Sequence, residues 1–208
     1  MKNQENATKY YDNFSKIYDF VSSKRYYHKP RQYAIEQLEL KEYQTVLNLP
    51  CGTGQNFSYF QNYLHQTGQI IGIDLSDGML EKSQRKIKNH QWKNIKIIKA
   101  DATKINSNWV REHLNEIKID VILCDLGLSG FPDWQNVIDN LLDILTPNGK
   151  IVIMDWYIEK PSLRGEFIKW IGKGEVNRPI WQYLQTKVEQ FKIRTFKQGD
   201  IFVASGRK

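Results

Sequence analysis

Long apolar runs and a secretion signal are both missing from this sequence of 208 residues. No stretch approaches the roughly 20 consecutive apolar residues that span a bilayer. The lysine-containing start, Met1 to Lys9, has no apolar centre of the kind found in signal peptides. We therefore expect a cytoplasmic protein. Cysteine is also scarce, because Cys51 and Cys124 are too few for a disulfide framework, and reduced thiols are expected.

Linkers and internal repeats are absent as well. No stretch rich in Pro, Gly and Ser divides the chain, which predicts a single domain over residues 1–208. Acidic residues are outnumbered, and the formal net charge of +7 favours an acidic partner such as nucleic acid, an anionic membrane surface or an anionic substrate. We interpret the densest basic group, Lys82 to Lys99, as the solvated face of a helix and the loop after it, with an anion-binding patch as the alternative.

One glycine-containing stretch, residues 46–56, organises the rest of the chain. A run rich in apolar residues from Val46 to Leu49 meets Gly52 and Gly54, and an amphipathic pattern begins near Asn56. This order is expected where a buried strand turns sharply into a helix. Because glycine has no Cβ, such a turn can adopt positive φ, lie against a ligand and direct free helix N-terminal amides at it.

Strands and helices alternate from this turn onward, which predicts an α/β fold. The alternation indicates a doubly wound, mostly parallel sheet with helices on both faces, because parallel neighbours need right-handed crossover connections. The predicted strands are residues 44–49, 69–74, 95–99, 119–124, 150–154, 191–196 and 200–205. The predicted helices between them include 54–65, one capped by Ser76, and 137–145, which ends at the turn 147–149.

Segments outside the core, residues 44–154, are predicted to cover it. Residues 1–43 would form N-terminal lid helices, one with an aromatic face over 8–22 and one beginning after Pro30 and ending near Leu40. Residues 155–190 would form a helical insert on the substrate side, with helices over 162–171 and up to about Gln190. Residues 191–208 would add the closing strand pair.

Polar residues follow the first four predicted strands. Ligands on doubly wound sheets bind beyond the carboxyl ends of the strands, where the winding direction reverses. We therefore expect these residues to converge on one site: Asn48, Gly52, Asp74, Asp101 and Asp125.

Two cofactor classes compete for a glycine turn followed by an acid 20 residues after Gly54. A dinucleotide fingerprint requires a third glycine where this chain has Phe57. S-adenosylmethionine has no pyrophosphate, and an acid after the second strand would bind both of its ribose hydroxyls. Asp74 suits that task, since one carboxylate can accept two hydrogen bonds.

At this point the sequence resembles the class I S-adenosylmethionine-dependent methyltransferases. Residues 48–54 (Asn-Leu-Pro-Cys-Gly-Thr-Gly) are similar to their glycine-rich first motif, 72–76 (Gly-Ile-Asp-Leu-Ser) to the ribose-binding second, and 100–102 (Ala-Asp-Ala) to the adenine loop. The resemblance implies a Rossmann-like, seven-stranded sheet whose last strand is antiparallel. Asn48 departs from the family, because the first motif usually begins with an acid.

The resemblance also implies roles for individual residues. Asp74 would bind the ribose, Asp101 would accept a hydrogen bond from the adenine amino group, and Met79 would pack on adenine. Leu75 and Ala102 belong to the two motifs that hold the nucleoside. Gly52 and Gly54 would allow close approach of the methionine portion, and Asn48 would contact its amino group weakly or through water. Cys51 and Cys124 are expected to pack beside the cofactor rather than bind a metal.

Methyl transfer from a sulfonium is a direct displacement that needs no covalent enzyme nucleophile. Holding acceptor, methyl group and sulfur in line and excluding water supply much of the acceleration, and a neutral amine must also lose a proton. The candidates for substrate orientation or proton acceptance are Tyr11, Tyr18, Asp125 and Asp155.

The acceptor is predicted less sharply than the cofactor. The segments after strands four and five resemble the branch that methylates amines of phospholipid and betaine-lipid head groups, or the related quinone-ring methylases. This favours a small-molecule amine acceptor. The basic and aromatic insert would either contact an anionic membrane or cover the active site.

Two alternatives to this function stay open. The positive charge favours RNA methylation, but no nucleobase-amine motif follows strand four and no RNA-binding module is appended. A non-catalytic, cofactor-binding regulatory protein is the other alternative, and Asn48 supports it.

Overall fold

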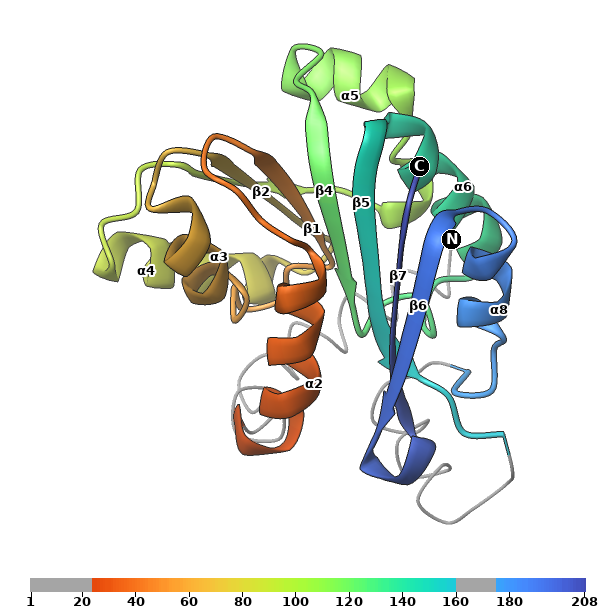
Figure 1. The fold of residues 1–208 in the computed structure, drawn as a ribbon. Coiled ribbons are helices and arrows are strands. Elements are labelled where there is room, and N and C mark those ends of the chain that lie inside the picture. The colour runs from red at the N-terminus through yellow and green to blue at the C-terminus, as the bar shows by residue number, and fades with distance from the viewer. Residues whose placement is uncertain (1–23, 160–174) are drawn as a thin grey trace.

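The computed structural model describes residues 24–159 and 175–208, and this part of the chain contains a single seven-stranded sheet with helices on both faces (Figure 1). The strand order is β3-β2-β1-β4-β5-β7-β6. The elements are α2 (Lys24–Gln37), β1 (Thr45–Leu49), α3 (Phe57–Leu64), β2 (Gln69–Asp74), α4 (Asp77–Asn89), β3 (Ile95–Lys99), the 3-10 turn η1 (Ala102–Lys104), α5 (Ser107–Leu114), β4 (Ile119–Asp125), α6 (Trp134–Ile144), β5 (Leu145–Trp156), α8 (Ile180–Gln185), β6 (Glu189–Phe196), η2 (Lys197–Gly199) and β7 (Ile201–Arg207).

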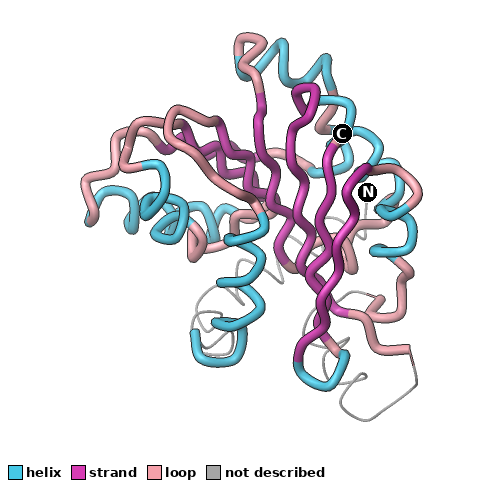
Figure 2. The backbone as a smooth tube through the Cα atoms, viewed as in Figure 1, coloured by secondary structure: helices cyan, strands magenta, loops and turns pink. Residues whose placement is uncertain are grey.

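The direction of the strands confirms the predicted Rossmann-like topology. The first five strands run parallel, and β7 is antiparallel to both β5 and β6. Figure 2 shows the strands (magenta) side by side, with helices (cyan) outside them. β1 lies between β2 and β4, so the winding direction reverses at β1. The carboxyl end of this strand is therefore the place where a ligand site is expected.

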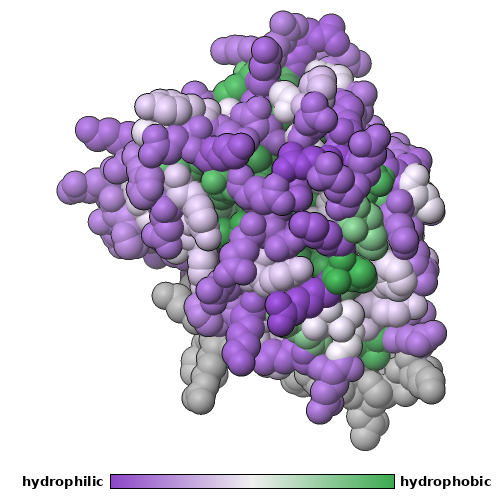
Figure 3. Space-filling view, in the orientation of Figure 1, coloured by the Kyte–Doolittle hydropathy of each residue, from purple (hydrophilic) through white to green (hydrophobic). Residues whose placement is uncertain are grey.

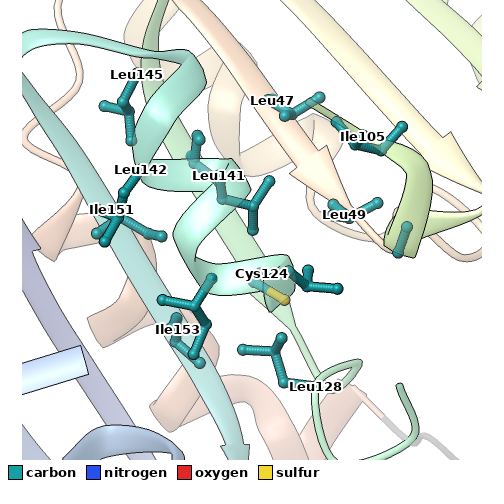
Figure 4. Close-up of a cluster of buried hydrophobic side chains, with 14 of the residues drawn as sticks. Leu47, Leu49, Ile105, Cys124, Leu128, Leu141, Leu142, Leu145, Ile151 and Ile153 are labelled. Carbon is teal, nitrogen blue, oxygen red and sulfur yellow. The ribbon is translucent and has the colours of Figure 1, made fainter. Parts of the chain in front are cut away.

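Two hydrophobic clusters, one on each face, hold the sheet between its helices. Side chains of α2, α3 and α4 pack on one face, and side chains of α5, α6 and α8 pack on the other. In the second cluster, Leu47 of β1 and Ile151 of β5 lie on the same side of the sheet as Leu141 and Leu142 of α6 (Figure 4). The buried pattern along β1 and β4 is nearly continuous, as expected for central parallel strands.

Several predicted boundaries are wrong. The helix predicted over 54–65 begins only at Phe57, because Gly52 and Gly54 both adopt positive φ and leave a non-helical turn. α2 already includes Lys24 and carries Pro30 inside it, where Tyr26 and Tyr27 pack against Trp156 and the helix continues despite the lost hydrogen bond.

Two further boundaries were misplaced around β5 and β6. The turn predicted at 147–149 lies within β5, which begins at Leu145 and bulges before the register resumes at Lys150; the bulge accommodates Pro147, which cannot donate a ladder hydrogen bond. The helix expected to reach Gln190 ends at Gln185, and β6 starts at Glu189 because pairing with β7 prevails there.

Two predicted helices cannot be compared with the structure. The lid helix over 8–22 and the insert helix over 162–171 lie outside the described residues. Within residues 24–159 and 175–208, no helix has both the length and the apolar character needed to cross a bilayer. The face in Figure 3 is predominantly hydrophilic, with small hydrophobic areas between polar side chains.

Candidate cofactor-binding site

The glycine turn forms the centre of the candidate site, at the carboxyl end of β1. Gly52 and Gly54 adopt φ values of +54° and +71°. A Cβ on Gly54 would lie 2.7 Å from the Phe57 ring, whereas a Cβ on Gly52 would meet no described atom within 4 Å. Phe57 is fully buried, and its ring also limits the space beside Gly72. The turn is thus closed by Phe57 on one side and open beside Gly52.

Asp74, at the end of β2, holds the glycine turn in place. Its Oδ2 accepts a hydrogen bond from the Gly52 amide at 2.8 Å, and its Oδ1 accepts one from the Ser76 amide at 3.0 Å. The hydroxyl of Ser83 donates to the Gly52 carbonyl at 2.8 Å. A carboxylate oxygen can accept more than one hydrogen bond, so these bonds to backbone amides do not by themselves exclude a bond to a ligand hydroxyl.

The segments that follow β2 and β3 carry the residues predicted to hold the nucleoside. Ser76 caps α4 by accepting from the Met79 amide at 3.2 Å, and Met79 is buried while Leu75 is half-buried. Asp101 is half-buried and caps η1, where its Oδ1 accepts from the amide and the hydroxyl of Thr103 at 3.0 and 2.8 Å. Ala102 is buried at the start of this turn.

Asn48 and Asp125 are joined by a buried amide that the sequence did not reveal. The Nδ2 of Asn56 donates to Asn48 Oδ1 at 3.2 Å and to Asp125 Oδ2 at 3.0 Å. Asn48 itself is fully buried and donates from Nδ2 to the Leu123 carbonyl at 3.3 Å. The side chain predicted to touch the cofactor thus bonds within the protein.

Arg31 is a second residue that sequence reasoning missed. From α2 it donates through Nε to Asp125 Oδ2 at 3.2 Å and through Nη1 to Gln55 Oε1 at 2.9 Å. Both members of the ion pair are buried. A lone arginine on an amphipathic helix carries no local signal for this contact, which spans 94 positions.

Asp155 lies near the carboxyl end of β5, and its carboxylate accepts hydrogen bonds from two backbone amides. Its Oδ2 accepts from the Ser129 amide at 3.0 Å, and its Oδ1 accepts from the Trp156 amide at 2.8 Å. Complete burial raises the pKa of Asp155 to about 6, while these amides act in the opposite direction. Asp155 therefore fastens the loop after β4 to the end of β5.

The two cysteines lie in the interior beside this edge. Cys51 follows β1, and Cys124 pairs with Leu49 across the sheet. Burial raises the pKa of both thiols well above the usual range, which disfavours the reactive thiolate. Within the described residues, no group of three or more His, Cys, Asp or Glu side chains is arranged to hold a metal ion.

The arrangement fits S-adenosylmethionine at the described positions. Gly52 leaves open space at its Cβ position, and the Asp74 carboxylate lies beside it, where it accepts from the Gly52 amide. Asp125 Oδ1 and Asn56 Oδ1 are buried and have no hydrogen-bond partner in the described part of the chain. Buried acceptors of this kind normally have a donor, and the cofactor's amino and hydroxyl groups are donors. The structure joins Gly52 and Asp74 directly and places the other predicted cofactor residues in or just after β1, or after β2 and β3, while Tyr11 and Tyr18 lie outside the described residues.

Comparisons with known proteins point the same way. A family model described as a methyltransferase domain matches residues 40–192. A demethylmenaquinone methyltransferase of Oceanobacillus iheyensis is 25% identical over 161 residues, which are 77% of this chain and 62% of the relative. The chain spans about three fifths of the length of the first curated relatives that it matches.

Solved structures share the fold. A methyltransferase from Aquifex aeolicus aligns with a TM-score of 0.60 and 15% identity over 85% of this chain and 88% of its own. Phosphoethanolamine N-methyltransferase 2 of Haemonchus contortus, solved with S-adenosyl-L-methionine, aligns with a TM-score of 0.69 and 12% identity over 86% of this chain and 52% of its own. With the family match over most of its length, the chain belongs to the methyltransferase-domain family, among the class I S-adenosylmethionine-dependent methyltransferases.

Proposed function

We propose that this chain transfers a methyl group from S-adenosylmethionine to a small-molecule acceptor. The observation that carries the proposal is the glycine turn held open by Asp74, with unpartnered buried acceptors on Asp125 and Asn56 beside it. The family match supports the same reaction. We assign it to one catalytic domain over residues 1–208.

The described side chains would hold the cofactor in distinct ways. Asp74 would accept the ribose hydroxyls, and Asp101 would accept from the adenine amino group. Met79, Leu75 and Ala102 would line the adenine face, while Gly52 and Gly54 would let the methionine portion lie against the backbone. The bound cofactor supplies an electrophilic methyl group, and the chain's contribution is to orient it and exclude water.

Aromatic side chains support an acceptor site beyond the end of β5. Trp156 is half-buried, and Tyr26 and Tyr27 of α2 contact its ring at centroid distances of 6.2 and 5.9 Å. Arg31, which bonds to Asp125, lies 5.8 Å from the Tyr27 ring. Aromatic faces attract both planar rings and cationic amines. We therefore place the acceptor beside these rings, close to the cofactor network.

An amine, such as a lipid head group, is the first candidate acceptor. Its support is the sequence resemblance, together with the fold shared with phosphoethanolamine N-methyltransferase 2. A quinol ring is the second candidate, because several relatives are named demethylmenaquinone methyltransferases. Contact with an anionic membrane stays a prediction, since residues 162–171, which carry the apolar side chains expected to make that contact, lie outside the described residues.

Product analysis with a labelled methyl donor tests the proposal. The full chain is incubated with methyl-labelled S-adenosylmethionine and, separately, with phosphoethanolamine, amine-bearing lipids, a demethylated quinol and RNA. We expect a product heavier by one or more methyl groups with an amine or the quinol, and none with the Asp74→Ala variant. Labelling of RNA alone would overturn the small-molecule acceptor. Cofactor binding without turnover on any acceptor would favour the non-catalytic alternative.

A further inference from the structure

Asn48 has a side chain that is turned inward at the position where the family carries an acid. It is fully buried, its amide nitrogen donates to the Leu123 carbonyl, and its oxygen accepts from Asn56. The residue is also neutral. It therefore presents neither a charge nor an exposed polar atom to the methionine end of a cofactor.

Asp125, on the neighbouring strand, has the opposite character. Both of its protein donors, Arg31 Nε at 3.2 Å and Asn56 Nδ2 at 3.0 Å, bond to the same oxygen, Oδ2. The other oxygen, Oδ1, is buried without a partner among the described residues. A buried carboxylate oxygen without a donor is unfavourable, which indicates a donor that arrives with a ligand.

Asn56 carries a second acceptor of the same kind. Its Oδ1 is also buried and unpartnered in the described part of the chain. A reversed amide would place this oxygen against Asn48 Oδ1 and Asp125 Oδ2, which are both acceptors, so the network fixes its orientation. Asn56 and Asp125 are thus hydrogen-bonded to each other, and each has one buried oxygen that takes no part in this contact.

An ammonium group matches this pair of acceptors, because it has three donors, no acceptor and a positive charge. We infer that Asp125, assisted by Asn56, binds the methionine ammonium of S-adenosylmethionine in place of the acid that Asn48 lacks. The inference rests on the proposed function and deepens it. It also reassigns Asp125, which sequence reasoning offered for substrate orientation, to the cofactor.

Arg31 is the positioning residue of this arrangement. Its guanidinium pairs with Oδ2, which leaves Oδ1 for the ligand and offsets the carboxylate charge before the cofactor binds. A buried carboxylate without such a partner would be strongly destabilising. The ion pair therefore lets the chain keep an acid at the end of β4 in its ligand-free state.

The test compares two ligands that differ only in the amino group. Calorimetry measures the affinity of the full chain for S-adenosylhomocysteine and for its deaminated analogue. We expect the wild type to prefer the amine by about tenfold or more, as charge-assisted hydrogen bonds predict. Asp125→Asn should reduce this preference to about twofold or less. Asp74→Asn, the matched control, should weaken both ligands and keep the wild-type preference, because ribose is common to both.

A second variant removes the other acceptor and keeps the ion pair of Asp125 with Arg31. Asn56→Ala should lower the amine preference to about threefold, and it tests the inference if Asp125→Asn does not fold. An amine preference that stays at the wild-type value in Asp125→Asn, or in Asn56→Ala where Asp125→Asn does not fold, would overturn the inference and leave the proposed function standing. Wild-type protein that binds neither ligand would overturn both.

Discussion

The two ends of the parallel strands both bury charged groups, but only one end pairs them fully within the protein. At the amino end, Lys150 is 3% exposed and donates to Glu39 at 2.8 Å, and Arg207 pairs with the same carboxylate. At the carboxyl end, Asp125 and Asn56 each keep a buried oxygen without a partner in the described chain. The difference indicates where a ligand is needed, because of these two charged networks only the one at the carboxyl end keeps a buried carboxylate oxygen, Asp125 Oδ1, without a partner in the described chain.

The pKa values of two carboxyl groups repeat this contrast. The hydrogen bond from Lys150 lowers the pKa of Glu39, so the amino end stabilises its negative charge. Burial raises the pKa of Asp155 to about 6, so the carboxyl end disfavours the charge there. The two shifts are opposite in sign, and a carboxyl group whose pKa is raised by burial is common at functional sites.

The largest expected effect concerns Asp74. Asp74→Ala removes the carboxylate that accepts from the Gly52 amide. The same carboxylate is predicted to bind the ribose hydroxyls. Loss of two charge-assisted hydrogen bonds should weaken S-adenosylhomocysteine binding by at least about 100-fold. Calorimetry measures this change. Tight binding by the variant would mean that the site is assigned to the wrong residues.

Glu39→Gln is the control for that prediction at the opposite end of the sheet. It leaves Lys150 buried without its carboxylate, so the free energy of unfolding should fall by about 1–2 kcal/mol, a modest value because Glu39 is partly exposed. Cofactor affinity should stay unchanged. If affinity fell in parallel with stability, the contrast between the two ends would not hold.

Local sequence signals explain which parts of the fold and site could be predicted. Alternating strands and helices, paired glycines and an acid directly after an apolar run are features of neighbouring residues, so Gly52, Gly54 and Asp74 were found. Arg31 and Asn56 were missed, since each acts through contacts with Asp125, 94 and 69 positions away. Such pairings depend on strand order and helix placement, which no short pattern encodes.

Element boundaries were predicted less well for a related reason. A proline-containing turn at 147–149 is absorbed as a bulge because β4 pairs with β5 both before it, at Leu145, and after it, from Lys150. Similarly, Pro30 lies inside α2 because aromatic packing on Trp156 keeps the helix intact around it. Tertiary pairing therefore overrode the local signal at both prolines. The roles of Tyr11 and Tyr18, and the cytoplasmic location, stay predictions.

A separate prediction concerns the pH dependence that Asp155 gives to stability. Its folded pKa of about 6 lies above the ordinary value of 3.8, so the folded protein holds this proton more tightly than the unfolded chain. Stability should fall as pH rises from about 4 to 6 and then level off, a contribution of at most about 3 kcal/mol. Glu39 acts with the opposite sign, because its stabilising charge is lost on acidification.

Denaturant unfolding of the wild type and Asp155→Asn between pH 4 and 8 isolates this contribution. The stability of the wild type relative to the variant should decrease across the interval from about 4 to 6 and stay constant above it, whatever the fixed cost of the substitution. A difference that does not vary with pH would show that Asp155 titrates normally. The carboxyl end would then lack the electrostatic penalty that sets it apart from the amino end.

The smallest effect separates the two glycines of the turn. Both have positive φ, so alanine should cost about 1 kcal/mol of stability at either position. At Gly54 the new Cβ would also lie 2.7 Å from the Phe57 ring, which adds about 1–2 kcal/mol of overpacking, whereas at Gly52 it would enter open space. Gly52→Ala should therefore be the more stable variant in urea unfolding and yet bind S-adenosylhomocysteine poorly, because that space is where the methionine portion would lie. Equal stability would show that the Phe57 ring yields to a Cβ on Gly54, and unimpaired binding by Gly52→Ala would show that the open side of the turn is not the ligand side.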